Sequence, residues 1–457
     1  MVTTAALSGP RARYPFELLI RMRRDRIPFL EEMARNYGDV VPFRIGPQRL
    51  VLVSHPDDIR DILVTHQKQF TKGRALERSK ELLGNGLLTS EGELHLRQRR
   101  LVQPAFHRAR IATYATQMAD AAGAMRDEWQ DGAVIDANAE MMRLTMVIVA
   151  RTLFGAKLES ETQSVARALR DVFEAFDFGL SPFTAITDRL PLPRRRRFLA
   201  ARTVLDDIIY GLIRERRADG RDHGDLLSML LQAQDTEGDG AGMSDVQLRD
   251  ELLTLFLAGH ETTANALSWT WLLLSRNAGP AATLRAEIDT VLGDRLPTAD
   301  DMPRLPYTRA GVAESMRLYP PAYIIGRRSI TPYRVRDTDF PARTIFLCSQ
   351  YITQRDVRWW PEPLRFRPER WLEPDDSRPK FAYFPFGAGT RICVAEQFAW
   401  MEATLLLATL ARKWQLHVEG PDPALEPIIT LRPRGGLTVR LEKRNQLVRK
   451  SGRMRSE

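Results

Sequence analysis

Residues 384–395 place two glycines and a cysteine immediately before a run of helix-forming residues. Gly387 and Gly389 precede Cys393 by six and four residues. Glycine accepts positive φ angles without strain, so the backbone can turn there and direct N–H groups at the sulfur. The dipole of the following helix favours a thiolate at the same place. The segment predicts either a tuned thiolate ligand or a buried structural cysteine in a glycine turn.

A second segment with chemical potential lies inside a long apolar stretch and runs from Ala258 to Thr262. Small side chains at Ala258 and Gly259 let another group approach a helix closely. Thr262 can donate a hydroxyl hydrogen bond outward, or bond back to the carbonyl four residues earlier and bend the helix. Glu261 is a candidate proton relay, or a carboxylate paired elsewhere beside a tolerated glycine kink. We interpret His260 as a helix-face residue and not as a ligand.

Two pairs of charged residues have helical spacing. Glu314 and Arg317 are three residues apart and share a helix face, as do His95 and Arg99, which are four apart. Alone, the Glu314–Arg317 pair predicts only a surface ion pair of small energetic value.

The sequence predicts a mainly α-helical chain with a minor β-rich part, and these elements must position the residues described above. Ser244 and Gln247 form a predicted capping box, and a helix over about 245–275 would be roughly 46 Å long, enough to cross the molecule. Apolar spacings of three and four predict helices through most of 57–320, interrupted near 191–197 and 235–242, and a final helix over about 395–414. The predicted β-rich pieces are 38–55, with a hairpin between 40–44 and 50–53, then 322–350, and 427–441, with a hairpin around Gly435 and Gly436.

The chain of 457 residues carries 67 basic and 58 acidic residues, a formal net charge of +9. A basic surface favours a small acidic protein, anionic lipid or nucleic acid, or is a solvated face without a partner. No zinc-ligand spacing and no interleaving of aromatic and basic residues supports nucleic-acid binding. The excess charge gathers in the first 26 residues, in Arg194–Arg197 and in a basic tail over 442–457.

Two cysteines, Cys348 and Cys393, cannot form the disulfide framework of a secreted protein, and Cys348 is interpreted as a buried strand residue. The first 28 residues contain no apolar run long enough for a signal peptide or membrane anchor. Inserting the helix that carries Glu261 into a bilayer would cost several kcal/mol. We therefore expect a soluble, cytoplasmic protein without a membrane anchor.

The cysteine segment resembles the haem-ligand loop of the cytochrome P450 family, Phe-x-x-Gly-x-Arg-x-Cys-x-Gly. It matches at Phe386, Gly389, Arg391 and Cys393 and departs at Ala395, where the family usually has glycine. The resemblance implies haem b (iron protoporphyrin IX) with Cys393 as the axial thiolate. Such ligation donates electron density to iron and favours O–O cleavage.

The helix segment resembles the family's oxygen-activation motif, Ala/Gly-Gly-x-Asp/Glu-Thr, with Ala258 and Gly259 beside the cofactor. The resemblance implies that Thr262 holds dioxygen and that Glu261 passes protons inward from water.

The charged pairs also match family patterns. Glu314 and Arg317 resemble the Glu-x-x-Arg pair, and Arg370 in 368–371 resembles the arginine that completes a buried structural triad. Segment 91–101 resembles the family's third-helix pattern, which implies that His95 and Arg99 bind a haem propionate. The further propionate ligands implied are Arg391 and Arg327, with Arg328 as the alternative to Arg327.

The resemblance covers about 39–441 and implies that 1–457 is one cytochrome P450 domain. The implied reaction inserts an oxygen atom from O2 into a hydrophobic small molecule, a terpenoid, fatty acid or steroid. Electrons would come from a ferredoxin or flavodoxin with its NAD(P)H-dependent reductase. The alternatives are an isomerase, dehydratase or peroxygenase of the same fold, which the acid–threonine pair argues against, and a basic nucleic-acid- or lipid-binding protein. The substrate-lining residues implied are Leu82 to Leu87, Phe256, Leu257, Ala322 to Ile325 and Ile428 to Thr430.

Overall fold

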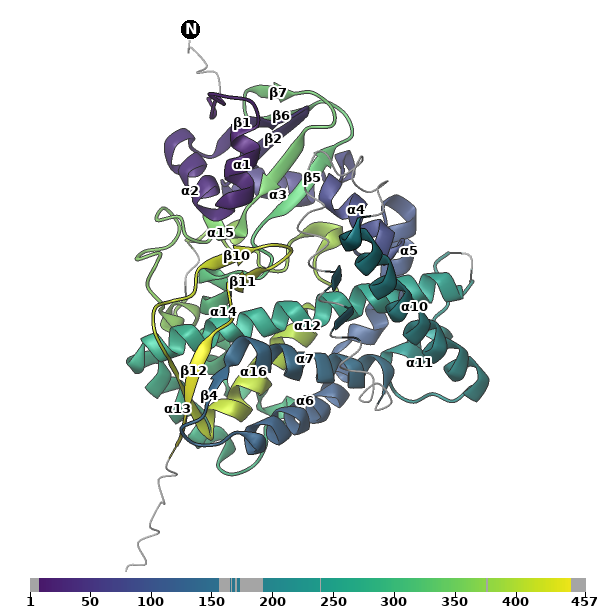
Figure 1. Ribbon diagram of the computed structural model, residues 1–457, viewed down its shortest axis with the longest axis vertical. Helices are drawn as coiled ribbons and strands as arrows, with labels where there is room; N and C mark the ends of the chain where they lie inside the picture. The colour runs from purple at the N-terminus through teal and green to yellow at the C-terminus, as the bar shows by residue number, and fades with distance from the viewer. Residues whose placement is uncertain are drawn as a thin grey trace, which may run out of the picture.

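The computed structural model describes residues 8–155, 165, 167–168, 171–172, 192–238, 240–374 and 377–444. A helical body makes up most of the molecule, and a smaller part rich in strands lies at the N-terminal end (Figure 1). The longer helices are α1 (Glu17–Arg24), α2 (Arg26–Tyr37), α4 (Arg74–Leu83), α5 (Gly92–Val102), α6 (Arg108–Glu128), α7 (Ala137–Phe154), α10 (Pro193–Asp219), α12 (Asp245–Arg276), α13 (Ala278–Leu292), α14 (Pro306–Leu318) and α16 (Glu396–Ala411). The shorter helices are α3 (Pro56–Arg60), η1 (Asp61–Thr65), η2 (Gln67–Gln69), η3 (Gln103–Phe106), α11 (Leu226–Gln232), η5 (Ala299–Arg304), α15 (Gln350–Thr353), η6 (Pro368–Trp371), η7 (Lys380–Ala382) and η8 (Gly389–Arg391).

The strands form one larger sheet and three small ones. The five-stranded sheet has the order β1 (Val40–Ile45), β2 (Gln48–Val53), β8 (Ile345–Cys348), β5 (Ile325–Ser329), β3 (Phe70–Lys72). The smaller sheets pair β6 (Tyr333–Val335) with β7 (Thr338–Phe340), β10 (Leu425–Pro427) with β11 (Leu431–Pro433), and β4 (Val134–Asp136) with β12 (Thr438–Lys443) and β9 (Trp414–Val418).

Helix α12 crosses the helical body, as its predicted length requires (Figure 1). The predicted capping box is present, since the Ser244 hydroxyl accepts from the Gln247 amide and the Gln247 side chain accepts from the Ser244 amide. Two paired N–H groups at the first turn give the helix a defined start. Near its other end Trp269 is buried and stacks on Tyr319 at 4.4 Å between ring centroids.

The glycine in α12 faces another helix. A Cβ atom at Gly259 would come within 3.0 Å of Val149 Cγ2, so the missing side chain lets α7 pack directly on α12. In the turn around it, the Thr145 hydroxyl of α7 donates to the His260 carbonyl at 2.9 Å. The close approach that the sequence predicted at Gly259 is therefore made by α7.

The larger sheet confirms the first predicted hairpin. Strands β1 and β2 pair antiparallel with Val40 opposite Val53, and β2 then runs parallel to β8. Cys348 ends β8 in the core, where burial raises the pKa of its thiol to about 12. The prediction of a buried strand cysteine is confirmed.

The predicted C-terminal hairpin around Gly435 and Gly436 is wrong. The hairpin is formed by β10 and β11 around residues 428–430, while β12 pairs with β9 and β4. The two glycines have φ angles of 79° and 88° and turn the chain away from β11. A Cβ atom at Gly436 would lie 2.2 Å from the Asp136 carboxylate, so this turn also packs against the start of α7.

Two predictions about the helical region need correction. The arginine run does not interrupt a helix, because Pro193 occupies the first turn of α10 and Arg194–Arg197 follow within it. Proline suits that position because its missing N–H would have no helical partner there. Short strands β3 and β4 also lie within the region predicted as helical. Pro191, predicted to break the helix, lies outside the described residues.

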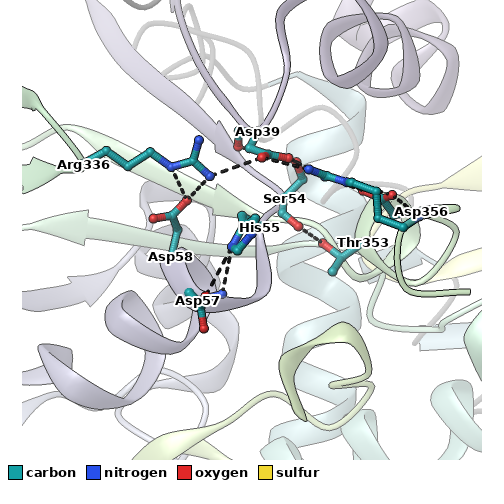
Figure 2. Close-up of polar contacts among 9 residues, drawn as sticks. Asp39, Ser54, His55, Asp57, Asp58, Arg336, Thr353 and Asp356 are labelled. Carbon is teal, nitrogen blue, oxygen red and sulfur yellow. Dashed lines mark hydrogen bonds and ion pairs between the residues drawn. The ribbon is translucent and has the colours of Figure 1, made fainter. Parts of the chain in front are cut away.

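An ion-pair network connects distant segments at the edge of the larger sheet (Figure 2). Asp39, directly before β1, accepts hydrogen bonds from Arg336 at 3.2 Å and from Arg358 at 3.0 Å. Arg336 also donates to Asp58 of α3 at 3.0 Å, and Arg358 to Asp356 at 3.0 Å. The network therefore connects the strand start, α3, the β6–β7 turn and the chain that follows α15.

Candidate functional site

The cysteine loop adopts the conformation that its glycines allow. Gly387 and Gly389 have φ angles of 74° and 69°, and the Cys393 amide donates to the Phe386 carbonyl at 3.0 Å. A Cβ atom at Gly389 would lie 2.2 Å from the Leu63 carbonyl oxygen, so the loop is seated against η1. Only glycine combines this backbone angle with such close packing.

The Cys393 sulfur lies in the protein interior beside open space. The side chain keeps exposed surface, yet burial raises the pKa of its thiol to about 11. A hydrogen bond from the Ala395 amide and the charge of Arg99 act in the opposite direction and favour the thiolate. Glu396 acts with burial and raises the pKa further, so the support for the anion that binds a metal comes from the Ala395 amide and Arg99.

One face of α12 also keeps exposed surface in the middle of a buried helix. Ala258 is exposed and Thr262 half-buried, whereas 252–256 and 263–274 are buried. The Thr262 hydroxyl donates to the Ala258 carbonyl at 2.8 Å, which is the second of the two arrangements that the sequence left open. Val394, next to the cysteine, packs against the buried cluster that contains Phe256, so the loop and this part of α12 border the same region.

Five basic side chains gather beside the cysteine loop. They include all four residues predicted to bind propionates and are Lys72, His95, Arg99, Arg327 and Arg391. Burial, followed by the charges of the other four, lowers the pKa of His95 to about 3. Burial and the Arg391 charge also lower the pKa values of Lys72 and Arg327.

The contacts of these cations leave room for an anion. Arg391 donates to the Ser90 carbonyl at 2.9 Å and pairs with Glu91, while Arg99 donates to the Ile392 carbonyl at 2.7 Å. Arg327 donates from Nη1 to its neighbour's carbonyl, that of Gly326, at 3.1 Å. Backbone carbonyls do not neutralise these charges, so the group favours a bound anion.

The geometry favours Arg327 over Arg328 as a propionate ligand. Arg327 is buried beside Arg391, whereas Arg328 pairs with Glu77. The side chains of consecutive strand residues point to opposite faces, which separates the two arginines.

Sequence reasoning missed Lys72. Its ammonium group donates to the Leu87 carbonyl at 3.2 Å and to the Leu88 carbonyl, and the strand register sets Lys72 opposite Arg327. A lysine in a three-residue strand has no motif around it, and only the pairing of β3 with β5 reveals its position. That pairing was not predictable from local pattern.

The donor set fits haem. The basic side chains of Lys72, Arg99, Arg327 and Arg391 outnumber the one carboxylate beside them, Glu91, and the neutral His95 ring can donate from a nitrogen. This set favours a group that brings two negative charges, as the propionates of haem do. Cys393 and Ala258 both keep exposed surface, and their chain neighbours Val394 and Leu257 pack against the same apolar cluster, as a flat macrocycle between loop and helix would need.

Glu261 is buried and bonded away from Thr262. Its Oε1 accepts from the Thr430 hydroxyl at 2.7 Å, and that hydroxyl accepts from the Asn265 amide at 3.0 Å. Asn265 in turn accepts from the Asn138 amide at 3.1 Å. Burial raises the pKa of Glu261, with Thr430 and Arg432 acting in the opposite direction. The carboxyl therefore holds its proton to a higher pH than an exposed glutamate does.

His260 matches its predicted place on a helix face. Its ring is buried, Nδ1 lies 3.1 Å from the Phe256 carbonyl, and burial lowers its pKa to about 4. Among the described residues, no group of three or more His, Cys, Asp or Glu has the arrangement of a metal site.

The predicted structural triad is assembled. Arg317 and Arg370 both donate to Glu314, at 2.8 and 2.9 Å, and Trp371 donates to its second oxygen at 2.9 Å. Arg317 also donates to the Gln354 and Pro363 carbonyls. Helix α14 and η6 are thus connected by a fully buried, hydrogen-bonded charge cluster far from solvent.

The predicted substrate-lining residues divide into two groups. Leu82, Leu83 and Leu87 pack with Phe256 in one buried apolar cluster. Of the others, Gly86, Tyr323 and Thr430 are also buried. Those that keep exposed surface are Gly84, Asn85, Leu257, Ala322, Ile324, Ile325, Ile428 and Ile429.

Comparison with known proteins decides the family, since the family model described as Cytochrome P450 matches residues 8–439. The chain belongs to the cytochrome P450 family. Cyclooctatin synthase of Streptomyces melanosporofaciens is 40% identical over 92% of this chain and 90% of its own length. Cyclooctat-9-en-7-ol 5-monooxygenase of the same organism is 38% identical over 83% of each chain, and pentalenene oxygenase of Streptomyces avermitilis is 36% identical over 89% of this chain and 90% of its own.

This P450 is an oxidoreductase, a haem-thiolate monooxygenase. The predictions of fold class, of the haem cofactor with an axial cysteine thiolate and of monooxygenase chemistry are confirmed. Within the described part of the chain, no helix has both the length and the apolar character needed to span a bilayer.

Proposed function

We propose that this cytochrome P450 binds haem b through the Cys393 thiolate and inserts one oxygen atom from O2 into a terpenoid. The observation that carries the proposal is that Cys393, Ala258 and Thr262 keep exposed surface, while their chain neighbours Val394 and Leu257 pack against one buried apolar cluster. When bound, the haem supplies oxygen activation, and its thiolate ligand favours O–O cleavage. The relatives named for cyclooctatin and pentalenene chemistry support a terpenoid over a fatty acid or steroid.

Further residues of the site have separate roles in this proposal. His95, Arg99, Arg327 and Arg391 hold the propionates, and Lys72 joins them. Phe386 and Gly389 shape the ligand loop, while Ala258 leaves room beside the macrocycle. Gly259 acts indirectly, by letting α7 support this part of α12.

Proton supply is assigned to the acid–threonine pair. Glu261 stores a proton on a buried carboxyl that Thr430 holds in place. The Thr262 hydroxyl, which here donates to the Ala258 carbonyl, would turn its proton toward dioxygen and position it by donating to it. Glu314, Arg317 and Arg370 keep α14 and η6 together and take no part in the chemistry.

We further propose that residues 1–457 form one catalytic domain that works in the cytoplasm with a ferredoxin or flavodoxin and its NAD(P)H-dependent reductase. The net charge of +9 supports an acidic electron donor.

The visible spectrum of the dithionite-reduced protein under carbon monoxide tests the haem assignment. A strongly red-shifted Soret band in the protein and its loss in Cys393→Ser, with Cys348→Ser unaffected, is the expected result. Incubation with a ferredoxin, its reductase and O2 against matched terpenoid, fatty-acid and steroid panels tests the substrate. Oxygenated products from the fatty acids or steroids alone would overturn the terpenoid assignment.

A further inference from the structure

The segment between α4 and α5 is attached to α12 through its backbone. The Asn85 amide donates to the Asp250 carboxylate at 2.7 Å, and the Leu87 amide donates to Glu251 Oε2 at 2.9 Å. Both acceptors lie on α12, more than 160 residues further along the chain. The backbone of residues 84–88 is thus held by two neighbouring carboxyl groups.

The segment fits against the helix without space for side chains. Gly84 has a φ of 54°, and a Cβ atom there would lie 2.1 Å from Asp250 Oδ2. A Cβ atom at Gly86 would lie 2.2 Å from the Thr254 hydroxyl. The two glycines let the peptide units reach the carboxyl groups directly.

The backbone N–H and the backbone carbonyl of Leu87 are both hydrogen-bonded to buried side chains. Glu251 accepts from its N–H, and Lys72 of β3 donates to its carbonyl at 3.2 Å. Glu251 is fully buried, and its second oxygen, Oε1, has no hydrogen-bond partner in the described structure. A buried carboxyl with one unpaired oxygen is costly when ionised, so this position favours the protonated form.

The held segment borders the proposed substrate space. Residues 251, 254, 258 and 262 follow helical spacing and share one face of α12, so Glu251 lies two turns before the exposed Ala258. Leu87 packs in the cluster of Phe256, and the next residue, Leu88, is exposed. Segment 84–88 therefore packs on the same helix face that carries Ala258 and Thr262, one to two turns before them.

The charges that face Glu251 come from two elements, α12 and β3. On α12 they are Asp250, which disfavours ionisation, and Arg249, which pairs with Asp250 and Asp206. On β3 it is Lys72, which favours ionisation and is itself surrounded by Arg391, Arg327 and Glu91. Burial is the largest influence and raises the pKa of Glu251 to about 8.

We propose that Glu251 is a positioning residue whose protonated carboxyl holds segment 84–88 closed against α12, and that opening of this segment for a hydrophobic substrate is linked to loss of that proton. The attachment stands on the contacts alone, while its consequence for substrate entry rests on the proposed function. An opened segment exposes Glu251 to water, where its pKa returns to the ordinary value near 4.5. Opening then becomes easier as pH rises from about 5 to 8 and levels off above 8, where the closed form is ionised as well.

Hydrogen exchange of the peptide containing Leu87, measured on the haem-loaded protein from pH 5 to 9.5, tests the attachment. After correction for intrinsic exchange, protection should fall by up to about tenfold per pH unit to pH 8 and then level off. Glu251→Gln keeps an acceptor for the Leu87 amide without a titrating proton, so its protection should not depend on pH. Glu251→Leu removes the acceptor and should lower protection at every pH.

Glu402 provides a matched control. It is a second buried carboxyl, on α16, whose pKa burial raises to about 8. Glu402→Gln should leave the pH dependence at Leu87 unchanged. Protection that is independent of pH in the parent protein, or equally pH-dependent in Glu251→Gln, overturns the proposal.

Stopped-flow mixing with a terpenoid that shifts the haem spin state tests the consequence for entry. The binding rate should rise between pH 6 and 8 in the parent and stay constant in Glu251→Gln. A binding rate with the same pH dependence in the parent and in Glu251→Gln, while Leu87 exchange differs between them, would limit Glu251 to holding the segment. That result would overturn its role in substrate entry. If terpenoids do not bind, the proposed substrate class fails, and the exchange data still decide whether Glu251 holds the segment.

Discussion

Lys72 and Arg327 lie directly opposite each other on the antiparallel strands β3 and β5, and both side chains are buried. Like charges at such a position destabilise a sheet. Burial, followed by the charges of Arg391 and Arg327, lowers the pKa of Lys72 well below its usual value. In the proposed propionate site, an anionic group beside these side chains would stabilise the pair.

Lys72→Met should therefore weaken haem binding. The substitution removes one charged donor of a propionate site, which is worth about 1.5–3 kcal/mol, and haem loss should be at least about tenfold faster. Transfer of haem to an excess of apomyoglobin measures the rate. Lys80→Met, at an exposed position of α4, is the control and should leave the rate unchanged. Equal rates for both variants would remove Lys72 from the propionate site.

Arg370→Met should destabilise the fold without changing the chemistry at the haem. The substitution leaves the Glu314–Arg317 pair buried with one donor missing, and breaking such a cluster costs about 3–5 kcal/mol. Urea unfolding followed by tryptophan fluorescence measures the loss. Arg365→Met removes an exposed ion pair with Glu362 and should cost less than about 1 kcal/mol. If Arg370→Met lost no more stability than Arg365→Met, the structural role of Arg370 would be contradicted.

The ion network around Asp39 should stabilise the protein in a pH-dependent way. Burial raises the pKa of Asp39, but hydrogen bonds from Arg358 and Arg336 outweigh burial and hold the pKa at about 2. Because the folded pKa is below the unfolded value of 3.8, the contribution is present above pH 4 and is lost as pH falls toward 2. Asp39→Asn should cost about 1 kcal/mol at pH 7, since both arginines are largely exposed, and less at pH 3.

Thermal unfolding of both proteins at pH 7 and pH 3 measures this difference. The gap in melting temperature should narrow at pH 3 and also at 1 M salt, which screens exposed charges. A gap that stays constant with pH would show that Asp39 contributes through packing or uncharged hydrogen bonds.

Local pattern predicted the features that depend on neighbouring residues. The capping box at Ser244, the β1–β2 hairpin and the glycine turn at Cys393 need only short-range geometry, and each is present. The motifs also named the triad of Glu314, because its partners are recognisable one by one.

Features that depend on pairing between distant segments were not predictable in this way. Lys72 enters the cationic group only because β3 pairs with β5, and Glu251 reaches Leu87 only because 84–88 lies on α12. The misplaced C-terminal hairpin has the same cause: Gly435 and Gly436 turn the chain, but the partner of β12 comes from β9 and β4.

Thr262→Ala should separate reductant consumption from product formation. The substitution removes a hydroxyl that lies on the exposed face of α12 and bonds to the Ala258 carbonyl, so proton delivery to oxygen loses its positioning group. NADPH use should continue while hydrogen peroxide replaces most of the product. Thr270→Ala removes the equivalent bond to the Ala266 carbonyl in a buried part of the same helix and should leave coupling unchanged. Unchanged coupling in Thr262→Ala would favour the isomerase, dehydratase or peroxygenase alternative, because those reactions need no timed proton delivery to dioxygen.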